Sequence, residues 1–142
     1  MTRMKSPVEE ASVRRKAEAV DAMGMALATN SVTVNGQSVS RKGECFRKEL
    51  SVNNSSGPVW TNISVSATSQ ASVSGNALVP KSPEVFTYDA DGNLTSDSLW
   101  TNVWNAENRL VLTESAAGVA TGARRREVWT YLPDGRWMER VV

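Results

Sequence analysis

Histidine is absent from this 142-residue chain. Without an imidazole, Ser-His-Asp and Cys-His nucleophilic catalysis, histidine acid–base catalysis and His-containing metal triads are all excluded. Cysteine occurs once, so no intramolecular disulfide can form and no standard structural zinc site can be assembled. We therefore expect a protein that is not an enzyme and that uses neither a cofactor nor a metal ion.

Long apolar runs and an excess of one charge are also missing. Lys and Arg total 16 against 15 Asp and Glu, which gives a formal net charge of +1. This balance creates no overall field that would attract nucleic acid or an anionic membrane. No run of about 18 apolar residues is present, and the first residues lack the apolar segment of a secretory signal. We expect no nucleic-acid partner and no membrane insertion.

The N-terminal residues favour a helix over positions 6–28. Ser6 and Glu9 have the spacing of a capping box, Pro7 stands at the first helical position, and the residues that follow are rich in helix formers. A Thr-Asn-Ser cluster then stops the helical pattern. The sequence therefore predicts an N-terminal helical segment within residues 1–30.

From residue 31 the pattern changes to an alternation of Ser, Thr and Val, which is typical of strands. Asn35-Gly36 is a strong hairpin signal. Ile63, Val65 and Ala67 recur with a period of two and are expected to face a core. Cys45 lies in a similar alternating context, which predicts a buried or half-buried thiol. We expect a small antiparallel β module over 31–80, with strands at 31–34, 37–40, 45–52, 59–68 and 71–79 and a boundary at Pro80 and Pro83.

Residues 81–142 contain one strand-turn-strand unit three times, at 87–94, 103–110 and 130–137. Each unit has a ring at its second residue, an acid at its fifth and Gly or Asn at its sixth. This chemistry predicts a type I turn closed by a residue of positive φ. The longer spacing before the third unit is explained by an enlarged loop at 115–126. In order of the three units, these residues are Tyr88, Asp91 and Gly92; Trp104, Glu107 and Asn108; and Tyr131, Asp134 and Gly135.

The first unit, Tyr88-Asp89-Ala90-Asp91-Gly92-Asn93-Leu94, resembles the YD repeat of Rhs proteins, in which an aromatic residue and Asp precede x-x-Gly-Arg/Asn-Leu. The resemblance covers residues 86–142, and the 31–80 module resembles the β-rich stretch ahead of these repeats in some bacterial members. Asn105 and Leu132 replace the Asp of the motif, and Asn102 stands where a ring is expected. These departures predict locally weak packing.

The resemblance implies a structural role. In the family, many such hairpins wind into a hollow β shell that encloses or carries a variable C-terminal effector, often a toxin. It implies a bacterial chain at the cell surface or secreted, with neighbouring repeats or an effector domain as partners. It also implies that these residues are a truncated fragment of such a protein. The expected fold is mainly β, with antiparallel hairpin repeats preceded by the small β module and the N-terminal helix.

The acids of the repeat allow two other interpretations. If Gly92 is placed at the sixth position of an EF-hand loop, Thr87 and Ser98 occupy the first and twelfth positions, where acids are required. Asp89, Asp91, Glu107 and Asp134 could supply a carboxylate pair for glycoside hydrolysis. All of them lie at predicted turns, where acids are common. Turn chemistry is the favoured interpretation in both cases.

Rings and cations leave further alternatives open. Arg124-Arg125-Arg126 with Trp129 and Tyr131 could bind phosphates and stack bases, although a solvated loop is favoured by the small net charge. Exposed rings could instead stack on sugars, with Trp100 and Trp129 as the candidates for a glycan-binding surface. The last strand, 137–142, is expected to present an open edge through which the chain could self-associate.

Overall fold

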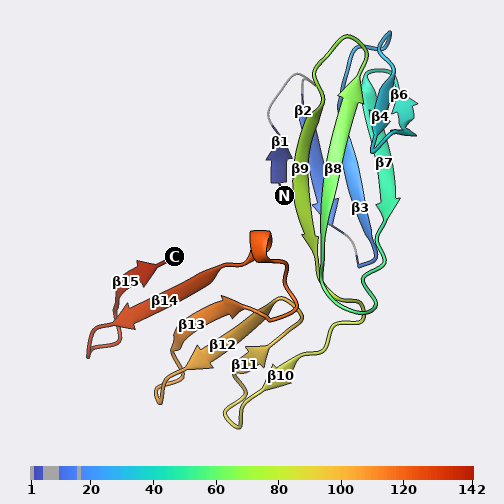
Figure 1. Ribbon diagram of the computed structural model, residues 1–142. Coiled ribbons are helices and arrows are strands. Elements are labelled where there is room, and N and C mark those ends of the chain that lie inside the picture. The colour runs from blue at the N-terminus through green and yellow to red at the C-terminus, as the bar shows by residue number, and fades with distance from the viewer. Residues whose placement is uncertain (1, 5–9, 16) are drawn as a thin grey trace. The chain divides into compact units, whose positions relative to one another are not determined.

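The computed structural model describes residues 2–4, 10–15 and 17–142, and these residues form mainly antiparallel β-sheet. The predicted fold class is confirmed. The chain divides into two compact units, one made of residues 1–54 and 59–79 and the other of residues 55–58 and 80–142 (Figure 1). No helix among the described residues is long and apolar enough to cross a membrane.

The first unit is a sandwich of two antiparallel sheets. One sheet has the strand order β1-β2-β3-β7-β6 and the other has the order β5-β4-β8-β9 (Figure 1). The strands of the first sheet are β1 (Thr2–Met4), β2 (Glu10–Arg15), β3 (Ala19–Met25), β6 (Ser40–Lys42) and β7 (Cys45–Ser51). Those of the second are β4 (Val32–Val34), β5 (Gln37–Ser38), β8 (Val59–Ala67) and β9 (Val73–Val79).

The core of this unit lies between the two sheets. Ile63, Val65 and Ala67 of β8 are buried, as their period of two predicted. They join Val20 and Phe46 of the facing sheet in one hydrophobic cluster. Alternation places every second residue of a strand on the buried face, so short Val- and Ser-rich strands are enough to fill the space between two sheets.

The predicted N-terminal helix is wrong, because residues 10–15 and 19–25 are strands. β3 pairs along its whole length with β7 and from Val20 to Met25 with β2, and Val20 and Ala22 enter the core. Helix propensity is a weak preference that such tertiary burial overrides. Ser6, Pro7 and Glu9, which carry the predicted cap, lie outside the described residues.

The hairpin at Asn35-Gly36 is confirmed, with positive φ angles of 48° and 73° at its two central residues. The strands expected at 45–52, 59–68 and 71–79 are also found, with ends shifted by one or two residues. The prediction of a buried or half-buried Cys45 thiol is also wrong, because the Cys45 side chain is exposed. Phe46 and Leu50 of the same strand point into the core, so alternation turns Cys45 outward.

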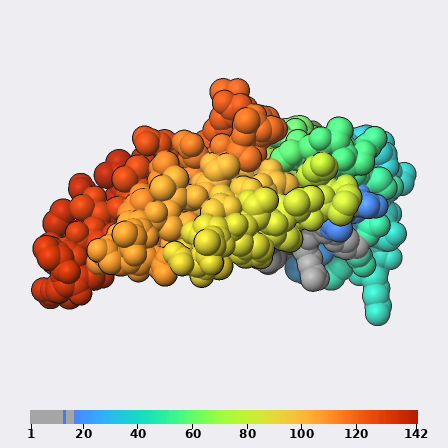
Figure 2. All heavy atoms as spheres, turned by 90° about the horizontal axis from the view of Figure 1, so that it is seen from below, coloured from blue at the N-terminus to red at the C-terminus, as the bar shows by residue number. Residues whose placement is uncertain are grey.

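The second unit is a single six-stranded sheet in which each strand pairs with the next, from β10 to β15 (Figure 1). Val119 and Ala123 are its buried hydrophobic residues, and both lie in the enlarged connection, which contains a short 3-10 helix at Thr121–Ala123. In Figure 2 the hairpins follow one another from yellow to red. The strands are β10 (Thr87–Tyr88), β11 (Leu94–Ser96), β12 (Trp100–Trp104), β13 (Leu110–Ser115), β14 (Arg126–Tyr131) and β15 (Trp137–Val141).

Candidate functional site: turns and junctions of the hairpin sheet

The three turns of this sheet have the same backbone geometry. In the first, the Asp89 N–H donates to the Asn93 carbonyl at 3.0 Å, and the Gly92 N–H donates to the Asp89 carbonyl at 3.2 Å. The same two bonds recur from Asn105 and Asn108 and from Leu132 and Gly135. The residues predicted to have positive φ do so, at 85° for Gly92, 57° for Asn108 and 84° for Gly135. Each turn is therefore a type I turn with a left-handed closing residue.

The Asp of the motif caps the turn with its side chain. Asp89 Oδ1 accepts the N–H groups of Asp91 at 3.0 Å and Asn93 at 2.8 Å, and Oδ2 accepts Asn93 Nδ2 at 3.0 Å. The side-chain bond from Asn93, followed by the backbone bonds, lowers the pKa of Asp89 below its ordinary value. The turn prediction named Asp91, the fifth residue of the unit, and assigned no side-chain cap to Asp89. Asp and Asn side chains tend to accept a hydrogen bond from the backbone N–H two residues later, and this tendency could have identified Asp89 as the capping residue.

Asn105 performs the same capping in the second turn. Its Oδ1 accepts the N–H groups of Glu107 at 3.0 Å and Arg109 at 2.9 Å. The weakness expected from this substitution does not extend to the turn, because an amide oxygen accepts the same bonds as a carboxylate. In the third turn Leu132 has no side-chain oxygen, and Asp134 Oδ1 takes over one bond, from the Arg136 N–H at 3.1 Å.

A ring joins each hairpin to the one before it. Trp104 Nε1 donates to the carbonyl of Leu94 at 2.9 Å, and the Tyr131 hydroxyl donates to the carbonyl of Leu110 at 2.8 Å. Both rings are the second residue of their unit, and both acceptors are the eighth residue of the preceding unit. Two different aromatic residues thus make one equivalent contact at the two junctions.

The seventh residue of the first and second units also reaches the unit that follows. Asn93 Nδ2 donates to Asn108 Oδ1 at 2.8 Å across the first junction. Across the second junction, the Arg109 guanidinium lies 5.1 Å from the centre of the Tyr131 ring, within the range of a cation–π contact. Arg109 Nη1 is only 3.3 Å from the point that a Cβ at Gly135 would occupy. Gly135 is therefore needed both for its positive φ and for this close approach.

The backbone register is the same at both junctions. Ser96 pairs with Thr101, and Leu112 pairs with Val128. In each pair the first residue lies two positions after the eighth residue of its unit, and the second lies three positions before the next ring. The two junctions therefore share a register, a ring contact and a contact from the seventh residue.

Asn102, which replaces an expected ring, is bonded on both sides. Its Nδ2 donates to the Leu94 carbonyl at 3.1 Å, and its Oδ1 accepts the Thr113 hydroxyl at 2.7 Å. The Leu94 carbonyl thus receives two donors, one from Asn102 and one from Trp104. Hydrogen bonds replace apolar contact at this position.

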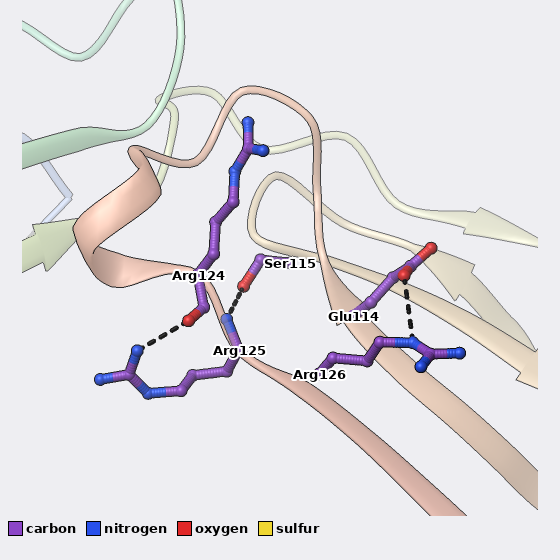
Figure 3. A pocket seen from close by; sticks show the side chains of 5 residues that line it. All are labelled: Glu114, Ser115, Arg124, Arg125 and Arg126. Atoms are coloured by element: carbon purple, nitrogen blue, oxygen red, sulfur yellow. Dashed lines mark hydrogen bonds and ion pairs between the residues drawn. The ribbon is translucent and has the colours of Figure 1, made fainter.

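A shallow pocket of about 310 Å³ lies beside the enlarged connection and is lined by Glu114, Ser115, Arg124, Arg125 and Arg126 (Figure 3). The three arginine side chains point away from one another (Figure 3). Arg124 is bound to the carbonyls of Val119 and Ala117 at 2.9 and 3.0 Å, and Arg126 lies 3.7 Å from Glu114. The Arg124 guanidinium holds the connection in place, and the three guanidinium groups do not converge on a common point where an anion would sit.

The rings considered for sugar stacking lie on one face of the sheet. Trp100 is paired with Ser115, Thr113 with Glu127, and alternation then brings Trp129 to the same side as Trp100. Both rings are half-buried. The most exposed rings of this unit belong instead to Phe86, Tyr88 and Trp137.

The turn acids do not gather into a metal site. No group of three or more His, Cys, Asp or Glu side chains among the described residues is placed to hold a metal ion. Asp91, Glu107 and Asp134 occupy the fifth position of three separate turns, and Glu107 and Asp134 pair with Arg109 and Arg136 at 2.7 and 2.8 Å. Comparisons of the chain with protein-family models, curated proteins and solved structures find no match.

Proposed function

We propose that this protein is a non-catalytic structural fragment of the Rhs/YD-repeat kind, whose hairpins stack into a continuous sheet. The observation that carries the proposal is the repeated junction, in which Trp104 binds the Leu94 carbonyl and Tyr131 binds the Leu110 carbonyl. In the family that the motif resembles, such sheets form a shell at the cell surface or in secreted proteins. Neighbouring hairpins or an effector domain would be the partners.

The energetics of the hairpin sheet support this role. The sheet has no second layer of its own, and its strands are mostly half-buried. Each ring-to-carbonyl hydrogen bond is worth about 1 kcal/mol, and the contact of Arg109 with Tyr131 about 0.5–1 kcal/mol. In repeat proteins such nearest-neighbour terms add up along the array. The stability of the sheet therefore depends on the number of junctions.

Lengthening the array tests the proposal. A second copy of residues 84–142 is appended directly after residue 142, with Val141→Ser and Val142→Leu to reproduce the two-residue Ser98-Leu99 connection between β11 and β12. The new junction lies between the last hairpin of the first copy and the first hairpin of the appended copy. Because this junction buries more surface, we expect the hairpin sheet to unfold at higher urea, in a transition with a larger m-value. The readout is urea unfolding followed by tryptophan fluorescence and far-UV circular dichroism.

The matched control carries Tyr88→Ala in the appended copy only. This substitution removes the ring that would bind across the new junction, so the gain in urea midpoint should be smaller. An appended copy that unfolds separately, with no change in the first transition, contradicts the stacking role.

A glycan-binding surface is the second candidate, because Trp100 and Trp129 share one face of the sheet. Aromatic faces stack well on the apolar faces of sugars. Glycan-array binding that is lost in Trp100→Ala or Trp129→Ala, with an unchanged far-UV spectrum, would support it. Unfolding of the hairpin sheet by the same substitutions would show that the rings serve packing.

A further inference from the structure

The two outer strands of the hairpin sheet carry exposed halves of a junction. At one end, Val85 and Tyr88 are 65% and 61% exposed, and the Tyr88 hydroxyl has no hydrogen bond to another described residue. At the other end, Trp137 and Met138 are 62% and 56% exposed on β15. Tyr88 corresponds to Trp104 and Tyr131, the rings that bind the preceding hairpin. Trp137 corresponds to Leu94 and Leu110, whose carbonyls accept from those rings.

The common register of the two junctions fixes what a third would look like. Two positions after the eighth residue is Glu139, and three positions before the ring is Val85, so these two residues would pair. The Tyr88 hydroxyl would then reach the Trp137 carbonyl, as Tyr131 reaches Leu110. Arg136, the seventh residue, would lie over the Tyr88 ring as Arg109 lies over Tyr131.

We propose that two copies of this chain associate head to tail, with β15 of one copy paired in antiparallel fashion with residues 85–88 of the next, which include β10. The inference rests on the proposed stacking function and names a second copy as the partner. The strands alternate in direction from β10 to β15, so β15 and an incoming β10 have the opposite directions that this pairing requires. The contact is heterologous, because two different edges of the sheet meet, and it can be repeated from one copy to the next.

The chemistry of the two outer strands favours head-to-tail pairing over the pairing of two identical edges. One end supplies a free hydroxyl donor and a ring, and the other supplies a carbonyl and the Arg136 guanidinium, whose side chain is 78% exposed. Pairing β15 with another β15 would leave the Tyr88 ring exposed in both copies.

Site-directed cross-linking of the full chain tests the register. Both variants carry Cys45→Ser, because Cys45 is exposed and would otherwise react. One chain then carries Val85→Cys and the other Glu139→Cys. Directly opposed residues of antiparallel strands have Cα atoms about 4.5–5.5 Å apart, which fits the roughly 4.4–6.8 Å of a disulfide. Mild oxidation of the mixture should give a disulfide-linked dimer, whereas neither chain alone should form one, because the proposed register brings position 85 only against position 139.

A chain with Met138→Cys in place of Glu139→Cys is the matched control, because neighbouring side chains of a strand point to opposite faces. It should cross-link to the Val85→Cys chain far less. Equal cross-linking of both, or no dimer in either mixture, overturns the proposal. A dimer formed by the Glu139→Cys chain alone also overturns it, since that product requires β15 to pair with itself.

The chain without introduced cysteines gives an independent measurement. Sedimentation velocity over a wide concentration range should show reversible association, and Tyr88→Phe should weaken it roughly two- to tenfold by removing the hydroxyl donor. A monodisperse monomer at every concentration overturns the proposal. If the appended array described above is stabilised while separate copies stay monomeric, only the head-to-tail inference fails. If the appended copy also unfolds separately, the stacking function fails as well.

Discussion

The hydroxyl of Tyr131 donates to the carbonyl of Leu110 at 2.8 Å, and this bond links the third hairpin of the sheet to the second. The equivalent bond from Trp104 links the second hairpin to the first. In both cases the ring contributes a polar atom as well as apolar surface. A half-buried ring whose N–H or O–H is hydrogen-bonded stabilises one register of strand pairing over registers shifted by one residue. Such a shift would turn the ring to the other face of the sheet.

Tyr131→Phe should lower the stability of the hairpin sheet by about 1 kcal/mol, since it removes the hydroxyl and leaves the Leu110 carbonyl without this donor. The measurement is the urea midpoint of the tryptophan fluorescence transition. Tyr88→Phe is the matched control, because the Tyr88 hydroxyl makes no such bond to any residue that the structure describes; at low concentration its midpoint should equal that of the parent. Equal effects of the two substitutions would contradict the assigned role of the junction.

Gly135→Ala should destabilise the sheet more than Gly92→Ala. Both residues have positive φ, at 84° and 85°, so either substitution should cost about 1–2 kcal/mol of backbone strain. Only at Gly135 would the new methyl group meet another side chain, Arg109 Nη1 at 3.3 Å, whereas nothing lies within 4 Å at Gly92. The difference between the two midpoints therefore measures the displacement of Arg109 from the Tyr131 ring. Equal losses would show that Arg109 moves aside freely.

The first turn should weaken in acid. Hydrogen bonds from Asn93 and the turn N–H groups lower the pKa of Asp89 in the folded chain, so its stabilising contribution is fully present above the ordinary carboxyl pKa. That contribution is lost as the pH falls through the lower, folded-state pKa. The test compares urea midpoints over this acidic range for the parent and for Asp89→Asn. The Asn variant should keep the turn, as Asn105 does, and should show a smaller pH dependence; an identical pH profile would contradict the capping role.

Local chemistry explains which parts of the fold could be predicted. Gly92, Asn108 and Gly135 each report a positive φ through their own residue type, and Asn35-Gly36 does the same for its hairpin, so these turns follow from a few neighbouring residues. The alternation of Ile63, Val65 and Ala67 predicts a buried face in the same local way.

Non-local contacts explain the failures. Residues 10–25 are rich in helix formers, but Val20 and Ala22 are held as strand residues by pairing with Leu50 and Lys48, far along the chain. Alternation alone does not say which set of residues faces inward, so the exposure of Cys45 was missed.

The junction contacts were missed for a related reason. Trp104 and its acceptor are 10 residues apart, whereas Tyr131 and its acceptor are 21 apart. No fixed spacing in the sequence therefore reveals that the two contacts are equivalent.

Leu132→Asp should stabilise the third hairpin. Leu132 stands where Asp89 and Asn105 cap the other two turns, and its backbone already makes the same two turn bonds, to Arg136 and from Gly135. A carboxylate at this position would accept the N–H of Asp134, a bond with no equivalent in the present turn. One such bond is worth about 0.5–1.5 kcal/mol, so the urea midpoint of the hairpin sheet should rise by a corresponding amount. Leu132→Ala, which removes the same apolar surface without adding an acceptor, should lower it. A fall in midpoint for both variants would mean that the apolar contacts of Leu132 contribute more to the third hairpin than the missing cap.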